Sequence, residues 1–337
     1  MIADRLFLTG SSDAGNRLET LCIDRATGAV RWRRGIDVAT PETIHDVNSL
    51  ASPTPASDGR WVVVYFGSYG LVCYDVDGEV AWQRPLANPD NTFGSAASPI
   101  LHAGHVLFCC DQRVDSYLCA IDLATGETAW RTERPGFGSG WSTPTVWRNG
   151  DVDELVVYGV WWLTAYDLRD GAQRWSVPGL ADEPIVTPVA GDGRLYVTSY
   201  NMRTSPEVIG LPTFDQVLKE CDVDADGQLT REEAAKNRSV LSRADTDGEG
   251  DHPLRIFFRF LDVDTDGVIE AEEWPKLIDW VGSFKQANGI IAIRPGDPER
   301  PAEIEWQESR GVPECPSPLF LDGLIYAVKN GGVGSWH

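Results

Sequence analysis

A short unit recurs five times along this chain of 337 residues, and no other sequence feature constrains its fold as strongly. The clearest copy, Leu118–Trp130, reads LCAIDLATGETAW: an apolar strand ends in Asp, a turn ends in Gly, and a second strand reaches Trp. The other copies are Leu21–Trp32, Leu71–Trp82, Leu163–Trp175 and the looser Gly289–Trp306. Such self-similarity predicts a repeat protein in which each unit buries its core against its neighbours.

Two independent markers measure the period of the repeat. The tryptophans that close the units are 50, 48, 45 and 131 residues apart, and they are Trp32, Trp82, Trp130, Trp175 and Trp306. A proline that follows Ser or Thr recurs at intervals of 46, 45, 44 and 130 residues, as Pro53, Pro99, Pro144, Pro188 and Pro318. Both markers therefore give a unit of about 45 residues and one insertion of about 85 residues.

Each unit offers about four short strands, which is typical of a β-propeller blade. A two-sheet sandwich is the main alternative, but it predicts no repeat with a fixed Trp. A large flat ring on the last strand can cover the apolar face of the next blade, so we interpret these tryptophans as packing residues rather than a ligand site. The first unit lacks an obvious first strand, and a sixth stops before its turn and Trp. We therefore expect a mainly β fold with about five to six four-stranded blades in an incomplete ring, truncated at both ends or completed by another chain.

The insertion occupies residues 202–286 and has a different pattern, because alternating strands give way to helical stretches. Helices are predicted over residues 212–222, 231–244, 254–262 and 271–284. Residues 1–201 would then form blades 1 to 4 and the start of blade 5. Residues 287–337 would complete blade 5 and begin blade 6, so the insertion separates the second and third strands of blade 5.

Two segments between these helices fit the twelve-residue calcium loop of an EF-hand position by position. Each offers carboxylates at positions 1, 3 and 5, a Gly at position 6, a backbone carbonyl at position 7 and a closing Glu at position 12. The predicted ligands of the first loop are Asp222, Asp224, Asp226, the carbonyl of Gln228, Thr230 and Glu233. Those of the second loop are Asp262, Asp264, Asp266, the carbonyl of Val268, Glu270 and Glu273. The sequence therefore predicts a small α-helical EF-hand pair with two Ca²⁺ sites, and a pair that has lost useful affinity is the alternative.

The predicted role of the calcium is structural. Calcium sensors open a groove that is often rich in Met, whereas this chain has only Met1 and Met202, both outside the hands. Leu229 and Ile269 occupy position 8, where paired loops exchange a short strand contact. A third acidic run at Asp245–Asp251 has no apolar residue at position 8 and no closing Glu, so we interpret it as the linker between the hands.

The charge and hydropathy of the chain restrict its partners. The net charge is −22, and residues 204–284 contribute 19 acidic and 8 basic residues. So acidic a protein disfavours nucleic acid as a partner. No apolar run approaches the ~20 residues of a transmembrane helix. The N-terminal sequence MIADRLFLTGSSD has no basic segment followed by an apolar run, so it predicts a strand rather than a secretory signal.

The sequence shows no recognisable catalytic constellation. The five His residues lack metalloprotease spacing, and neither a nucleophile elbow nor a phosphate loop is present. His45, Asp46 and Asn48 lie in a connector, where ordinary loop hydrogen bonding is favoured over a ligand site. The stretch Gly136–Trp141, GFGSGW, is interpreted as a connector rather than a ligand cradle.

The seven cysteines do not predict a disulfide framework, because their number is odd and their spacing is not that of a metal site. Cys22 and Cys73 take the same repeat position as Ala120, Ala165 and Ala292, which indicates a small packed residue. The vicinal pair Cys109–Cys110 lies in a predicted strand, where alternation places one thiol on each face. Whether this pair forms a disulfide is left open.

The repeated (A/C)xD–xxTG–xxxW unit resembles the tryptophan-docking repeat of pyrroloquinoline-quinone (PQQ)-like β-propellers. Residues 48–82 and 312–332 resemble a planctomycete-type bacterial branch of that superfamily. The resemblance covers roughly 250 residues outside the insertion. It implies a secreted or periplasmic protein with further blades at both ends. Since this chain shows no signal peptide, its localisation is left open.

The resemblance implies two functional classes. Quinoprotein dehydrogenases carry PQQ and calcium on the ring axis, an Asp base and a vicinal disulfide, and Cys109–Cys110 resembles the last of these. Other members are non-catalytic scaffolds similar to the propeller lipoprotein of outer-membrane assembly. We favour a calcium-binding scaffold whose propeller face binds protein or saccharide ligands, with no catalytic residue identified. The alternative is a PQQ-dependent oxidoreductase such as an alcohol dehydrogenase.

Overall fold

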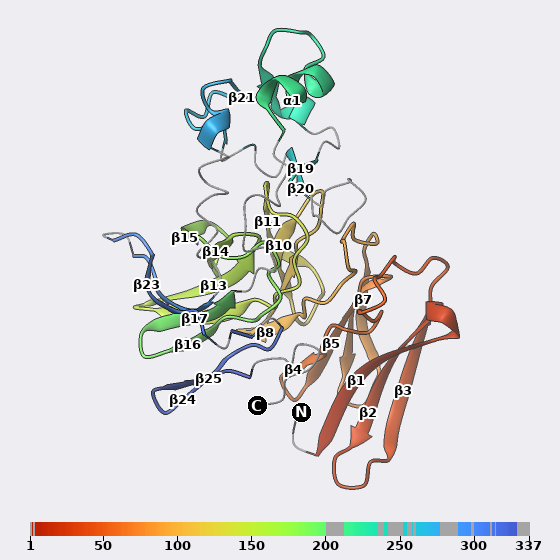
Figure 1. Ribbon diagram of the computed structural model, residues 1–337. Coiled ribbons are helices and arrows are strands. Elements are labelled where there is room, and N and C mark those ends of the chain that lie inside the picture. The colour runs from red at the N-terminus through yellow and green to blue at the C-terminus, as the bar shows by residue number, and fades with distance from the viewer. Residues whose placement is uncertain are drawn as a thin grey trace.

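The computed structural model describes most of the propeller and the core of the insertion. The described residues are 2, 4–199, 212–234, 239–241, 252–254, 258, 261–276, 289–297, 300–310, 312–313 and 315–328. Within them, four antiparallel sheets have four strands each, one has three strands, and three are two-stranded. The five larger sheets follow one another in chain order from the red N-terminal sheet, and the blue β24–β25 hairpin follows the last of them (Figure 1).

Each large sheet is one blade, and the blades are numbered here in chain order. Blade 1 comprises β1 (Arg5–Ser12), the short 3-10 helix η1 (Asp13–Gly15), β2 (Arg17–Asp24) and β3 (Val30–Asp37). Blade 2 comprises β4 (Ala56–Ser57), β5 (Trp61–Phe66), β6 (Gly70–Asp75) and β7 (Val80–Pro85). Blade 3 comprises β8 (Ile100–His102), β9 (His105–Cys110), β10 (Tyr117–Asp122) and β11 (Thr128–Glu133). Blade 4 comprises β12 (Thr145–Asn149), β13 (Val152–Gly159), β14 (Trp162–Asp167) and β15 (Gln173–Pro178).

Blade 5 is interrupted by the insertion, yet its sheet is complete. It comprises β16 (Val189–Gly191), β17 (Arg194–Ser199), β22 (Gly289–Arg294) and β23 (Glu303–Glu308). Its second strand β17 pairs directly with β22, so the chain leaves blade 5 after its second strand and returns at its third. The exit and return points predicted near residues 202 and 286 lie outside the described residues. Two further strands, β24 (Leu319–Leu321) and β25 (Leu324–Tyr326), form a hairpin beside β16.

The repeated Asp–Gly turn has the same local cause in successive blades. In blade 3, Asp122 Oδ1 accepts hydrogen bonds from the amides of Ala124 and Thr125 at 3.0 and 2.8 Å. Gly126 then adopts φ +76°, a conformation that favours glycine. At this point of the third strand, the register between the last two strands shifts in all five blades: before the turn Asp in blades 1 to 4, for example between Ala120 and Ile121, and before Arg294 in blade 5. Such a bulge increases the local twist of the sheet.

The first four repeat tryptophans pack against a glycine of the next blade, as predicted. In the first three copies, Nε1 donates to the carbonyl that follows the turn Asp of the next blade, at 2.9 Å each. These bonds join Trp32 to Val76, Trp82 to Leu123 and Trp130 to Leu168. The ring lies against the turn glycine, so that a Cβ on Gly78 or Gly126 would lie only 2.8 Å from it. Tryptophan and glycine therefore form one complementary contact.

The last two copies depart from this pattern. Trp175 also packs against a glycine of the next blade, Gly296, but its Nε1 donates to Glu154 of its own blade at 2.8 Å. Trp306 of β23 is 42% exposed. At the opposite end, no ring packs on the turn glycine of blade 1: a Cβ added at Gly28 would meet no atom within 4 Å among the described residues beyond its chain neighbours.

The described part of the insertion combines helices with two-stranded sheets. It contains helices α1 (Phe214–Cys221) and α2 (Arg231–Ala234) and the strands β18 (Leu229–Thr230), β19 (Ser239–Leu241), β20 (His252–Pro253) and β21 (Val268–Ile269). The prediction of one helix over 231–244 was wrong, because Ser239–Leu241 is a strand that pairs with β20. The hydrogen bonds of this strand with β20, whose paired residues are eleven or more positions away, override the local preference for helix. The predicted linker at 245–251 lies outside the described residues.

Candidate metal centre

The first loop is positioned by helix α1. Thr213 and Gln216 form a capping box: Gln216 N donates to Thr213 Oγ1 at 3.3 Å, and Thr213 N donates to Gln216 Oε1 at 2.9 Å. The helix buries Phe214, Val217 and Cys221 on one face and ends there, with Asp222 as its C-cap. The end of helix α1 therefore fixes the position of Asp222, the first predicted ligand.

The loop backbone then folds around its own carboxylates. Asp222 accepts from Ala225 N at 2.7 Å through Oδ1 and from Gly227 N at 3.0 Å through Oδ2. Asp226 Oδ1 accepts from Gln228 N at 2.8 Å. Ala225 and Gly227 both adopt positive φ, +59° and +84°, which permits the sharp turn expected at position 6. The carboxylates at positions 1 and 5 therefore turn toward the loop's own backbone amides.

The second loop repeats this geometry. Thr265 and Gly267 have φ of +62° and +95°. Asp264 Oδ1 accepts from Asp266 N at 3.2 Å, and Asp266 Oδ1 accepts from Val268 N at 3.0 Å. Asp262 is only 6% exposed, and its Oδ1 has no hydrogen-bond partner among the described residues. A buried carboxylate oxygen without a donor indicates that a cation belongs at this position.

The closing glutamates bend into their loops in the same way. Glu233 accepts from Val223 N at 2.7 Å and from the amide and hydroxyl of Thr230 at 3.0 and 2.8 Å. Glu273 accepts from Val263 N at 2.7 Å and from Glu270 N at 3.2 Å. Each glutamate is 8% exposed. Both carboxylates are therefore held against positions 1 to 3, where they can close a metal site.

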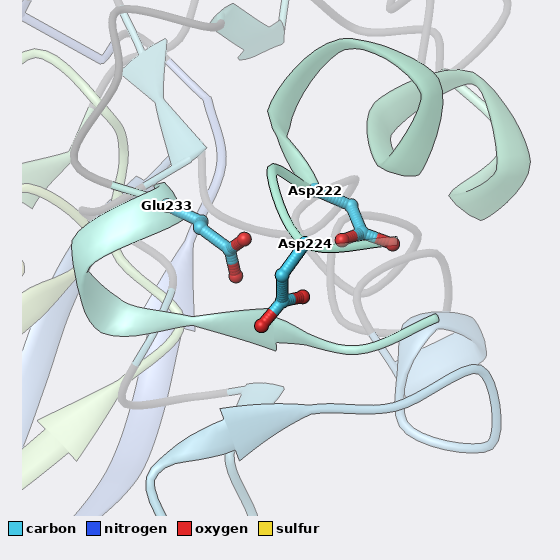
Figure 2. Close-up of side chains that lie close together, drawn as sticks. All are labelled: Asp222, Asp224 and Glu233. Carbon is cyan, nitrogen blue, oxygen red and sulfur yellow. The ribbon is translucent and has the colours of Figure 1, made fainter. Parts of the chain in front are cut away.

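Three carboxylates converge in each loop. The groups are Asp222, Asp224 and Glu233 in the first loop and Asp262, Asp264 and Glu273 in the second, and the oxygens of each group lie within 4.8 Å of one another. Figure 2 shows the first group, with Glu233 facing the two aspartates across the loop. Like charges this close repel unless a cation lies between them. Hard oxygen donors in this number fit Ca²⁺.

The predicted ligands at positions 5 and 9 do not join the two groups of three, and those at position 9 differ between the loops. Asp226 and Asp266 lie on their loops but outside the two groups of three. At position 9, Thr230 donates to Glu233, whereas Glu270 accepts from Gln228 Nε2 at 2.6 Å and so links the two loops. The sequence did not predict this link, because it joins side chains 42 residues apart.

The loops are also joined by the predicted strand contact. Leu229 pairs with Ile269 and Thr230 pairs with Val268 in the two-stranded β18–β21 sheet. Leu229 and Ile269 are fully buried. The two candidate sites therefore share a backbone bridge and an apolar core.

Other candidate residues have structural partners. His45 N donates to Phe93 O at 3.2 Å, and Asn48 Nδ2 donates to the same oxygen at 2.8 Å, so this connector makes ordinary loop hydrogen bonds. In Gly136–Trp141, Phe137 is buried and Trp141 Nε1 donates to Gly94 O at 3.0 Å, which confirms a connector. Asp46 has no side-chain hydrogen bond or ion pair among the described residues.

The cysteine pair divides between two cores, as alternation predicted. Cys109 is buried in the cluster shared by blades 3 and 4, whereas Cys110 packs against the cluster shared by blades 2 and 3. Both are free thiols. Burial raises the pKa of Cys110 to about 12 and also raises the pKa of Cys109. Cys22 and Cys73 are fully buried small residues, as predicted.

A cavity of about 410 Å³ lies between the turns of blades 3 and 4. The charged groups on its wall are already paired: Arg148 with Asp153 at 2.8 Å and Arg169 with Asp167 at 2.7 Å. It therefore presents no convergent set of uncompensated polar groups to a ligand. No helix among the described residues has the length and hydropathy to cross a membrane.

Comparisons with solved structures give partial matches at low identity. BamB from Moraxella catarrhalis is 17% identical, with a TM-score of 0.40, over 59% of this chain and 54% of that chain. A europium-containing methanol dehydrogenase is 12% identical, with a TM-score of 0.42, over 59% and 48%. Quinohemoprotein alcohol dehydrogenase from Comamonas testosteroni is 15% identical, with a TM-score of 0.42, over 59% and 41%. The chain thus matches about half the length of each, and no curated protein matches its sequence.

Two family profiles match the sequence. An EF-hand profile matches residues 254–278, which include the whole second loop. The profile described as outer membrane protein assembly factor BamB matches residues 18–205, more than half of the chain and all of blades 2 to 4. This chain, a β-propeller with an EF-hand insertion, therefore belongs to the BamB family of outer membrane protein assembly factors.

Proposed function

We propose that this chain is a calcium-binding scaffold. Its EF-hand pair would hold two calcium ions in a structural role, and its propeller would bind protein or saccharide ligands without catalysing a reaction. The observation that carries the calcium assignment is the convergence of three carboxylates in each loop, together with the unpartnered Oδ1 of buried Asp262. A divalent cation would neutralise these charges and satisfy that oxygen.

The residues that would hold the ions follow from the loop geometry. Glu233 and Glu273 can each supply two oxygens, because both are pinned inside their loops by backbone amides. The aspartates at positions 1, 3 and 5 and the carbonyls of Gln228 and Val268 would complete each set. Calcium accepts six to eight such oxygens, whereas magnesium favours smaller octahedral sites.

Two observations support the scaffold assignment: the family description and the positions of Cys109 and Cys110. The family description names an assembly factor, which is a binding role. Among the described residues, no observation favours the alternative of a PQQ-dependent oxidoreductase. Cys109 and Cys110 lie on opposite faces of β9 in separate cores, so they do not offer a quinone the vicinal disulfide that the resemblance implies.

Calorimetric titration tests the metal sites. We expect two calcium ions per wild-type chain, one for Glu233→Gln or Glu273→Gln, and none for the double variant. Glu272→Gln is the matched control, because Glu272 is exposed at position 11 and should leave both sites intact. A wild-type chain that binds no calcium, or a double variant that still binds two ions, would contradict the proposal.

The non-catalytic role needs a separate test. The protein is incubated with PQQ and calcium, and dye-linked alcohol oxidation is measured. We expect neither a bound quinone absorbance nor turnover. Stoichiometric PQQ binding with turnover would replace the scaffold assignment with that of an oxidoreductase.

A further inference from the structure

The turn between β13 and β14 in blade 4 has an unusual composition. It consists of Val160 and Trp161, whereas two-residue hairpin turns usually contain Gly, Asn or Asp. Trp161 adopts φ +63°, a conformation that bulky side chains rarely take. A strained turn made of apolar residues requires compensation from the surrounding structure.

The two residues are buried although they form the tip of a hairpin. Val160 is 1% exposed and Trp161 is 2% exposed. The connector to blade 5 fixes the backbone of the turn: Trp161 N donates to Ala181 O at 3.1 Å, and Leu180 N donates to Trp161 O at 3.2 Å. The backbone of the turn is therefore fixed, and the large ring is enclosed by protein.

The core that contains this ring belongs mainly to the insertion. Val160 and Trp161 form one continuous hydrophobic cluster with buried residues of the EF-hand pair. Those residues are Phe214, Val217 and Cys221 of α1, Ala234 of α2, Leu229 and Ile269 of the loop bridge, and Leu254, Phe258, Leu261 and Trp274. The tip of blade 4 and the interior of the EF-hand pair thus share one core.

The equivalent turns of blades 2 and 3 show that this arrangement is specific. In blade 2, Tyr69 packs against the cluster of blades 1 and 2. In blade 3, the positive-φ residue is Asp115, which is polar and exposed. Only the turn of blade 4 contributes to the EF-hand cluster among the described residues. The insertion arises from the corresponding turn of blade 5, which is the next blade along the chain.

We propose that the Val160–Trp161 tip is an intramolecular target of the EF-hand pair, so that calcium binding and docking of the insertion onto blade 4 are coupled. The inference rests on the proposed calcium sites. EF-hand pairs receive an apolar anchor from a partner in the interior between their helices. Here the same chain supplies the anchor. Leu229 and Ile269 connect the two events, because each adjoins predicted ligands in sequence and lies in the shared core.

Coupling of this kind is reciprocal. The first test therefore measures calcium affinity by titration in Trp161→Asn, a substitution that removes the ring and suits positive φ. We expect about a tenfold loss of calcium affinity, within the usual range of coupling between sites. The matched control is Tyr69→Asn, which removes an aromatic ring from the equivalent turn of blade 2 and should leave the affinity unchanged. An unaltered affinity in Trp161→Asn would overturn the inference while leaving the calcium sites established.

A second test needs no variant. Amide hydrogen exchange is compared in the wild-type chain with calcium and with chelator, for peptides covering residues 156–164 and, as the internal control, residues 65–72. We expect chelation to speed exchange in residues 156–164 only. Equal protection of that peptide in both conditions, with calcium binding confirmed by titration, would refute the coupling. A wild-type chain without calcium binding would overturn the proposed function together with this inference.

Discussion

Blade 2 and the EF-hand insertion hold their shapes by different means. In blade 2, β5 and β6 are buried along almost their whole length, and a four-stranded ladder satisfies their backbone groups. In the insertion, the paired strands that join the two loops are two residues long, and six carboxylates converge in two groups. Apolar burial stabilises a blade without any ligand, whereas the clustered charges of the insertion oppose folding until a cation is bound. The two regions should therefore respond differently to the same perturbation.

The largest expected effect is that of calcium removal, and it should be concentrated in the insertion and in the Val160–Trp161 tip that shares its core. At a free calcium concentration 1,000 times the dissociation constant, each site would stabilise the folded insertion by about 4 kcal/mol. Adding chelator should therefore lower the unfolding temperature of the insertion and leave the propeller transition in place. Calorimetry with and without chelator checks this. An equal shift of both transitions, or no shift of either, would contradict this difference between the propeller and the insertion.

Within the propeller, the largest effect should come from a buried ion pair between blades 3 and 4. Arg134 is fully buried, donates to both oxygens of Asp111 at 2.7 and 2.8 Å, and reaches the hydroxyl of Tyr166 in blade 4. Arg134→Met would leave the Asp111 charge buried and unpaired, which costs about 3–5 kcal/mol. Denaturant unfolding measures the loss, and calcium affinity should not change.

A double variant separates charge from packing at this site. Arg134→Met combined with Asp111→Leu removes both charges, so most of the lost stability should return. If the double variant is as unstable as the single one, the pair acts through shape or through Tyr166 rather than through charge.

Tryptophan docking should matter where the ring is buried against the next blade. Trp82 is 9% exposed and docks on blade 3, whereas Trp306 is 42% exposed. Trp82→Ala should destabilise the propeller by about 3 kcal/mol, near the lower end for large buried aromatic residues. Trp306→Ala should change the stability by less than about 0.5 kcal/mol. Equal losses in denaturant unfolding would show that the exposed Trp306 is covered in solution.

The smallest expected effect concerns a buried carboxyl in the connector between blades 1 and 2. Glu42 is 6% exposed, and burial raises its pKa, although Ser95 donates to it through its amide and hydroxyl at 3.1 and 2.9 Å. Since the folded state holds this proton more tightly, the contribution of Glu42 to stability is complete below its unfolded pKa and falls as pH rises through its folded pKa.

Glu42→Gln keeps the neutral form at every pH. The variant should therefore be more stable than wild type at pH 8 and no more stable at pH 4, as measured by urea unfolding. Calcium affinity is again the control and should not change. A variant that is less stable than wild type at pH 8 would show that the folded state stabilises the ionised carboxylate of Glu42.

The sequence by itself determined the features that depend on neighbours a few residues away. The turn at Asp122–Gly126 forms because an Asp side chain caps nearby amides and Gly accepts positive φ. The calcium loops follow from the same kind of local chemistry, since Asp222 and Asp226 bind amides within five residues. A period of about 45 residues then sufficed to predict blades, because each copy repeats the same local pattern.

The tertiary structure decided which residues meet across long separations. It exposed Trp306 while burying Trp82, although both occupy the same position of the repeat. It turned Ser239–Leu241 into a strand. It also placed Trp161 in the core of the EF-hand pair. The physical reason is that burial and strand pairing depend on distant parts of the chain, which no local pattern of the sequence records.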